Sequence, residues 1–344
     1  MGPFRLAPWR TMCLLVATIA LGCADRTSDA NPILNQSLSA HFRASRPIVL
    51  QEGLENLVVT PLFHLHSDTT ILVADPKAVR VAQYDNVGAI VWEYNVRGDS
   101  AGSMQVPIAL AKTTEGYWIG DAVNGLFLID SASHRFVRRL PTVERVLQDV
   151  VAINDSVLVL AGPVDAVGRN GPSWVRALYT RSGEEIWRAM RPRSSLPSVA
   201  LQSFSRVVLS TYQTSIIAVH SLLDTLYVFD VALGQMKGAH PLGLSPTFPA
   251  SLANAKQRPD EAAVADLVRL WVGALSTDTT YVIGLGRGSG TNVRYQNAMG
   301  PLTRSGRPLQ LRSAEAVVAG RDGLVLSTDD RTASPTHLHL WSGR

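Results

Sequence analysis

The feature that most constrains this chain is a regular spacing of short β-rich runs. Each run ends in a turn residue followed by glycine or a near equivalent. These turns are at 85–88, 130–134, 180–183, 230–234, 303–306 and 341–343. Their first residues are 45, 50, 50, 73 and 38 residues apart, and a four-stranded propeller blade takes about 40–50 residues. The spacing therefore predicts an all-β fold, a six-bladed β-propeller over residues 47–344.

One interval is longer than a blade needs. It contains residues 245–266, which are rich in proline and alanine, and Pro259-Asp260-Glu261 within them is typical of a helix start. We therefore expect an inserted loop with a short helix in this unit.

The last unit is one strand short, because it reaches only the end of a third strand at 341–344. Residues 47–50 and 54–60 are strand-like and precede the first blade. Pairing them with the last blade would remove an open sheet edge. We expect this N-terminal strand to complete the last blade and close the ring.

The N-terminus has the pattern of a targeting segment. Arg5 and Arg10 form a basic region before an apolar stretch at 11–21, which is too short to span a bilayer comfortably. The following Ala20-Leu21-Gly22-Cys23 resembles the lipobox of bacterial lipoproteins. This resemblance implies that residues 1–22 are a signal peptide, that Cys23 is acylated on its thiol, and that 23–46 form a flexible tether. The alternative is a plain signal peptide cut near Gly22, which leaves a free thiol.

The cysteine content agrees with lipidation. The only cysteines are Cys13, inside the signal, and Cys23, so no disulfide framework or cysteine-rich metal site is expected. Ala24 follows Cys23, and by resemblance to the sorting rule of Gram-negative lipoproteins this implies the outer membrane. The body would then face the periplasm or the cell surface.

The charge balance selects no partner. The chain carries 32 Lys and Arg against 28 Asp and Glu, a net charge of +4, and these residues are scattered. A nucleic-acid binder shows a dense basic stripe instead. We therefore expect no nucleic acid as a partner.

Two stretches carry a family resemblance. In each stretch, a first strand ends in Ala-Asp or Gly-Asp, and a second strand ends in an apolar or aromatic residue followed by Asp. The first strands are Leu72-Val73-Ala74-Asp75 and Gly116-Tyr117-Trp118-Ile119-Gly120-Asp121, and the second strands are Arg80-Val81-Ala82-Gln83-Tyr84-Asp85, with Gly88 in the turn after it, and Leu126-Phe127-Leu128-Ile129-Asp130. This pattern resembles NHL-type six-bladed β-propellers over about two blades. The pairs Gly88 with Trp92 and Gly183 with Trp187 also resemble quinoprotein-type PQQ repeats, which build an outer-membrane scaffold lipoprotein.

For several candidate residues we expect a structural role and no catalytic or ligand-binding one. Asp75 and Asp121 follow second strands, where an Asp side chain accepts N–H bonds in a tight turn. The loop 286–290 lacks the nucleophile-elbow and dinucleotide patterns. We expect the tryptophans in apolar runs to pack between blades; these are Trp92, Trp118, Trp174, Trp187, Trp271 and Trp341.

Histidines are the remaining candidates for a metal site. His64-Leu65-His66 and His337-Leu338-His339 each place two imidazoles on one strand face. This is compatible with a metal pair and equally with a polar strand face. We assign no metal, no cofactor and no catalytic residue. The histidines are His41, His64, His66, His134, His220, His240, His337 and His339.

Two functions follow from these expectations. The first is an outer-membrane-anchored lipoprotein whose propeller is a binding or scaffold module for an envelope protein, a peptide or a glycan, without enzymatic activity. The alternative is a metal-dependent hydrolase or lyase acting in the central channel. The oligomeric state stays open.

Overall fold

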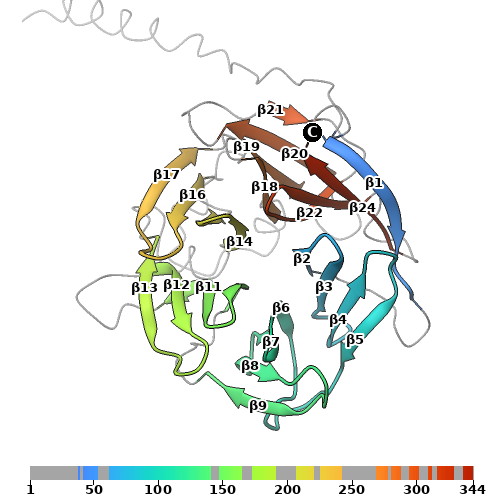
Figure 1. The fold of residues 1–344 in the computed structure, drawn as a ribbon, viewed down its shortest axis with the longest axis vertical. Helices are drawn as coiled ribbons and strands as arrows, with labels where there is room; N and C mark the ends of the chain where they lie inside the picture. Colours follow the sequence, from blue (N-terminus) through green and yellow to red (C-terminus); the bar gives the residue numbers. More distant parts are fainter. Residues whose placement is uncertain are drawn as a thin grey trace, which may run out of the picture.

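A computed structural model describes the chain as six antiparallel sheets of four strands each. The sheets are arranged around a common centre (Figure 1). The described residues are 38, 42–52, 62–140, 147–164, 173–190, 207–220, 225–241, 269–277, 280–287, 294–301, 309–311, 316–328 and 336–343. The predicted insertion at 245–266 and Cys23 lie outside these ranges.

The sheets follow one another in chain order, each a four-stranded meander except the last. Sheet 1 is β2 (Leu62–Ser67), β3 (Thr70–Asp75), β4 (Arg80–Asp85) and β5 (Ile90–Tyr94). Sheet 2 is β6 (Pro107–Thr113), β7 (Gly116–Asp121), β8 (Gly125–Ile129) and β9 (Phe136–Arg139). Sheet 3 is β10 (Asp149–Asn154), β11 (Val157–Val164), β12 (Ser173–Tyr179) and β13 (Glu185–Ala189).

The second half of the chain repeats the arrangement. Sheet 4 is β14 (Val207–Tyr212), β15 (Ser215–His220), β16 (Thr225–Asp230) and β17 (Met236–Pro241). Sheet 5 is β18 (Arg269–Thr277), β19 (Thr280–Arg287), β20 (Arg294–Pro301) and β21 (Leu309–Leu311). Sheet 6 is β22 (Ala316–Arg321), β23 (Leu324–Thr328), β24 (His337–Gly343) and β1 (Phe42–Val49), in the order β1-β24-β23-β22.

The first strands of the sheets form the inner ring. Going round it, β22 contacts β2, β2 contacts β6, β6 contacts β10, β10 contacts β14, β14 contacts β18, and β18 contacts β22 again. Radial sheets whose innermost strands meet in a closed cycle are the architecture of a β-propeller. The predicted all-β propeller is therefore confirmed. The predicted turns at 85–88, 130–134, 180–183 and 230–234 each follow the third strand of a sheet. The turn predicted at 341–343 is wrong, because these residues are the end of β24 and pair with β1, and 303–306 lie outside the described residues.

Burial explains why the middle strands have nearly continuous apolar runs. Each sheet packs against a neighbour on both faces, so every residue of β7 is buried and so are five of the six in β3. An outer strand such as β9 is largely exposed and carries arginines. The sequences of the middle strands are therefore almost continuously apolar, whereas those of the outer strands mix polar and apolar residues.

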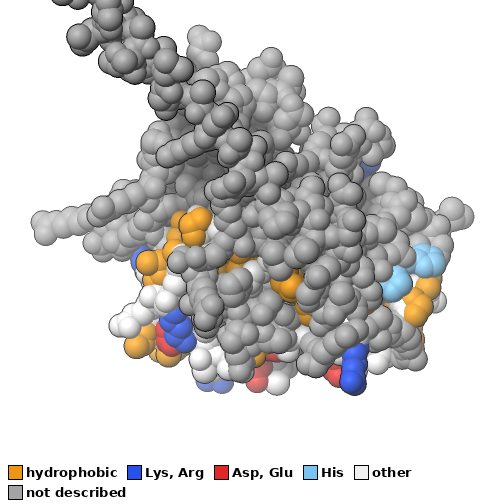
Figure 2. Space-filling view, turned by 90° about the horizontal axis from the view of Figure 1, so that it is seen from above, with side chains coloured by type: hydrophobic (Ala, Val, Ile, Leu, Met, Phe, Trp, Pro, Cys, Tyr) orange, Lys and Arg blue, Asp and Glu red, His pale blue; other side chains and the backbone are white. Residues whose placement is uncertain are grey.

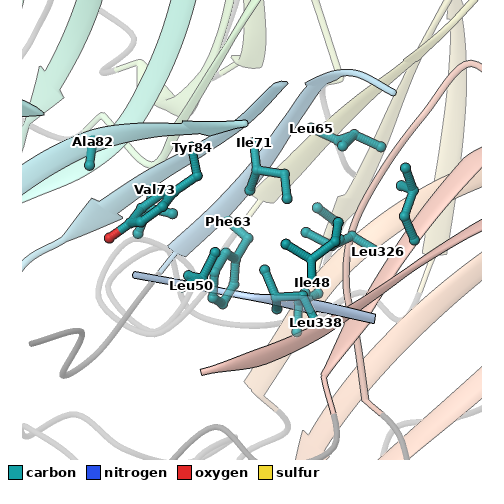
Figure 3. Packing of buried hydrophobic residues seen from close by; sticks show 13 residues of the cluster. Ile48, Leu50, Phe63, Leu65, Ile71, Val73, Ala82, Tyr84, Leu326 and Leu338 are labelled. Carbon is teal, nitrogen blue, oxygen red and sulfur yellow. The ribbon is translucent and has the colours of Figure 1, made fainter. Parts of the chain in front are cut away.

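The N-terminal strand completes the last sheet, as predicted. Strand β1 pairs antiparallel with β24, with Pro47 opposite His339 and Val49 opposite His337. Ile48 and Leu50 point into a hydrophobic cluster that joins sheet 6 to sheet 1 and includes Leu338 (Figure 3). The pairing of the predicted closing segment is confirmed for 47–49, whereas residues 54–60 lie outside the described ranges.

The predicted start of the propeller at Pro47 is wrong by five residues. Strand β1 begins at Phe42, inside the segment expected to be tether. Phe42 is buried, but Arg43 and Pro47 are exposed because β1 is the outermost strand of its sheet. That exposure permits a polar start of the strand, which has the composition of a tether.

The tryptophans pack between neighbouring sheets, as predicted for the five whose side chains are described. Trp187 of β13 donates its indole N–H to the carbonyl of Val231 in sheet 4, at 3.0 Å. A Cβ on Gly234 would lie 2.5 Å from the Trp187 ring, so this turn admits only glycine. The side chain of Trp271 is outside the described set.

Candidate functional site

The centre of the ring contains a small cavity of about 40 Å³. Its volume is enough for one or a few water molecules. It is lined from four inner strands, β2, β10, β14 and β22, and its polar side chains are His64, Asp149, Ser210, Thr211 and Arg321. This cavity is the candidate site because it collects polar groups from sheets that are distant in sequence.

The most buried charge at the cavity is Asp149, which is 2% exposed. One carboxylate oxygen, Oδ1, lies 3.4 Å from Nδ1 of His64 on β2 and accepts the N–H of Val150 at 2.8 Å. The other, Oδ2, accepts the N–H of Leu209 on β14 at 2.8 Å. Asp149 therefore joins sheets 1, 3 and 4, and buried acidic groups of this kind need such partners.

A second set of bonds joins sheets 4 and 6. The hydroxyl of Ser210 donates to the carbonyl of Gly320 at 2.8 Å. The N–H of Asp322 donates to the carbonyl of Thr211 at 3.1 Å, and the Asp322 carboxylate accepts the N–H of Gln213 at 3.0 Å. These bonds connect strands two positions apart in the ring, so side chains and backbone fill much of the channel here.

One end of the channel is basic. His66 lies near the end of β2, Lys112 near the end of β6 and Arg321 at the end of β22. Burial, followed by the positive charges of Arg321 and Lys112, lowers the pKa of His66 to about 4. His66 is therefore a neutral imidazole at pH 7, with two cations nearby.

The aspartates at the ends of second strands are turn residues, as predicted. Asp75 accepts the N–H groups of Lys77 and Ala78 at 3.1 and 3.0 Å. Asp121 accepts those of Val123 and Asn124 at 2.9 and 2.7 Å. These are the short-range bonds that Asp makes in tight turns.

The two histidine pairs do not meet. His64 and His66 lie on β2 at the inner ring, whereas His337 and His339 lie on β24, which is hydrogen-bonded to β23 and β1. Within the described ranges, nowhere do three or more His, Cys, Asp or Glu side chains gather as a metal ion would require. A helix with the length and hydropathy needed to cross a bilayer is absent from the same ranges.

Sequence reasoning missed three exposed valines in the β5–β6 and β7–β8 connections, which hydrogen bonds join. Val96, Val106 and Val123 are 46%, 36% and 49% exposed. They lie where β5 ends, where β6 begins and in the turn between β7 and β8. Beyond its turn bonds, Asp121 also accepts the N–H groups of Gln105 and Val106 at 2.8 and 2.7 Å. We call Val96, Val106 and Val123 the valine surface.

Hydrogen bonds fix the backbone of the β5–β6 connection and join it to the β7–β8 turn. Asn124 donates its side-chain N–H to the carbonyls of Gly98 and Ser103 at 3.2 and 2.9 Å. The N–H of Met104 donates to the carbonyl of Val96 at 2.8 Å. On the face that Figure 2 shows, the coloured side chains include charges of both signs beside apolar side chains.

Comparison with known proteins identifies the fold and no more. No protein family matches the chain, and no curated protein is similar to it. A protein of Bacteroides fragilis NCTC 9343 that is named as an exported protein aligns with a TM-score of 0.60 at 12% identity, over 90% of this chain and 97% of its own. A member of the DUF4221 family from Bacteroides vulgatus ATCC 8482 aligns with a TM-score of 0.55 at 8% identity, over 88% of this chain and 98% of its own. At such low identity these similarities establish that the chain has the fold of these two structures over most of its length.

Proposed function

We propose that this protein is an exported lipoprotein whose propeller is a binding scaffold for a protein or peptide partner in the cell envelope. The propeller is a single ring of six blades, one for each sheet, and resembles the NHL type. The closed cycle of inner-strand contacts and the Ala74-Asp75 and Gly120-Asp121 strand ends support that assignment. Export is supported by the signal-like N-terminus and by the name of the similar Bacteroides fragilis protein.

The anchor and the ring are close along the chain. Phe42, where β1 begins, is only 19 positions after Cys23. A chain of that length spans at most about 65 Å when fully extended. Acylation of Cys23 would therefore keep the propeller near an outer-membrane leaflet, and the body needs no membrane-binding face of its own.

The single observation that carries the binding role is the valine surface. Three half-exposed valines project from two neighbouring sheets, and the surrounding hydrogen bonds fix their backbone. An exposed apolar group on a rigid frame loses little conformational entropy when a partner covers it. Its apolar character favours a protein or peptide over a glycan among the partners expected from the sequence.

Crosslinking and pull-down from native envelopes test the partner. We expect Val123→Asp to lose the partner captured by the natural protein, because burying the new carboxylate at the interface costs free energy. Val91→Asp is the matched control, since Val91 is also exposed but lies on the outer strand β5. Equal capture by both variants would exclude the valine surface as the binding site.

Fractionation tests the anchor separately. Cys23→Ser removes the acylated thiol, so we expect the protein to move from the membrane fraction to the soluble periplasmic fraction. Retention of the variant in the membrane fraction would contradict lipid anchoring.

A further inference from the structure

The basic end of the channel is built from three consecutive sheets. β22, β2 and β6 are neighbours in the inner ring, and all three run in the same direction along the channel. Arg321, His66 and Lys112 each lie at or next to the last residue of their strand. The topology therefore places three basic groups at one rim, on the side away from the valine surface.

His66 lies at an irregularity in the pairing of β2 with β3, where it has no directly opposed residue. Leu65 pairs with Ile71 and Ser67 with Thr70, which leaves His66 as the extra residue of a β-bulge. Bulges re-aim side chains and recur near binding sites. Equivalent irregularities occur at Ile153 of β10, but only sheet 1 carries an ionisable residue there.

The Lys112 ammonium lies between sheets 1 and 2, where it contacts one residue of each, and Arg321 has a carboxylate beside it. The Lys112 ammonium donates to Oε1 of Gln83 at 2.8 Å and lies 5.4 Å from the centre of the Tyr117 ring. Burial lowers the pKa of Lys112. The Arg321 guanidinium lies 3.2 Å from the Asp322 carboxylate, and its side chain also lines the central cavity.

The described carboxylates around this end are mostly committed to other bonds. Asp149 binds His64 and two backbone N–H groups. Asp155 accepts the N–H of Thr114, and Glu115 pairs with Arg138. Asp68 is exposed in the β2–β3 turn, so Asp322 is the described carboxylate that pairs with a rim cation.

We propose that this end of the channel is a binding site for a small oxyanion, a phosphate or carboxylate group, held by Lys112, His66 and Arg321. Cations that are partly removed from water gain more from an anion than exposed cations do. Arg321 supplies a planar pair of donors and Lys112 a point charge, and neutral His66 contributes a ring N–H. Burial is the main reason that the pKa of His66 is lowered, and a bound anion would offset the smaller contribution from the charges of Arg321 and Lys112.

The test is an NMR titration of the His66 ring protons with inorganic phosphate, repeated with acetate, at constant ionic strength set by chloride. We expect saturable shifts and a pKa of His66 that rises by about one pH unit when phosphate binds, since an adjacent opposite charge favours the protonated ring. A stronger response to phosphate identifies a phosphate site, and a stronger response to acetate a carboxylate site. Shifts that chloride reproduces would overturn the proposal.

Variants locate the site on the rim. Lys112→Gln and Arg321→Gln should each weaken binding about tenfold, which is the loss of one charge-assisted bond. Lys237→Gln is the control, because Lys237 pairs with Asp230 at the outer strand of sheet 4. Equal affinities in all three variants would refute the assignment. Val123→Asp should bind phosphate normally, so failure of the protein-binding role would not affect this result.

Discussion

The closing strand makes a sharp prediction about how the ring is held together. Ile48 of β1 is buried in the cluster that joins sheet 6 to sheet 1, against side chains such as Leu338 and Phe63 (Figure 3). Its neighbour Val49 is 41% exposed on the same strand. Ile48→Ala and Val49→Ala therefore remove apolar atoms from the two faces of one strand, with the same backbone pairing.

The magnitude follows from the burial of each side chain. Truncating a fully buried isoleucine to alanine costs about 2–5 kcal/mol through lost transfer free energy and the cavity left behind. The unfolding entropy of a ring of about 300 residues is about 0.6 kcal/mol/K. A loss of about 3 kcal/mol then lowers Tm by about 5 °C, whereas the change at Val49 stays within about 0.5 kcal/mol and about 1 °C.

Calorimetry or circular dichroism on the purified variants measures both Tm values. We expect a large decrease in Tm for Ile48→Ala and a small one for Val49→Ala. If Ile48→Ala melts with the natural protein, β1 does not close the ring through its buried face. If both variants lose the same amount, pairing of the backbone alone decides closure, and the inward packing described above is refuted.

Three further changes test other parts of the fold. Gly88→Ala should lower Tm more than Gly98→Ala. Both glycines have a positive φ that strains alanine, but only at Gly88 would the new Cβ also meet a β1 carbonyl oxygen, at 1.9 Å against 3.9 Å to the nearest atom at Gly98; equal shifts in thermal melts would contradict this. Asp121→Asn should cost about 1–3 kcal/mol in denaturant melts, since the amide turns a donor toward N–H groups that need an acceptor; an unchanged midpoint would be inconsistent with the turn described. Burial lowers the pKa of His220 to about 3 in the folded protein, whereas the ordinary pKa of histidine is 6.5. As pH falls below 6.5, His220 is therefore protonated in the unfolded protein first, and the free energy of unfolding should fall by about 2 kcal/mol by pH 5. Replacing His220 with Leu should flatten this loss of Tm between pH 6.5 and 4, and an unaltered slope would show that other groups cause it.

Local chemistry made much of the fold predictable. The turns after the third strands of sheets 1 to 4, the Asp bonds at 75 and 121, and the missing fourth strand of the last sheet depend on residues a few positions apart or on a count of strands. The burial of Trp92 and Trp187 followed from their apolar neighbours. Short stretches of sequence determine such features, and the structure confirms these ones.

Features that depend on the closed ring were not predictable in the same way. The contact between His64 and Asp149 joins residues 85 positions apart on sheets that are not neighbours in the chain order. The bulge at His66 has no turn residue to mark it. Phe42 starts a strand whose first half contains Arg43, Ser45 and Arg46, a composition typical of a linker, so its pairing with β24 is not evident from the sequence.

The pairing of Phe42 with Gly343 has a practical consequence. Directly opposed residues in an antiparallel pair have Cα atoms about 4.5–5.5 Å apart, so the seam within sheet 6 between β24 and β1 is a β-hairpin that lacks only its turn. A two-residue connection between these positions would make the propeller continuous, and new ends could then be opened at any hairpin on the opposite side. The seam thus marks where a circular permutation could join the chain, and a label placed after Gly343 would stand beside the start of β1.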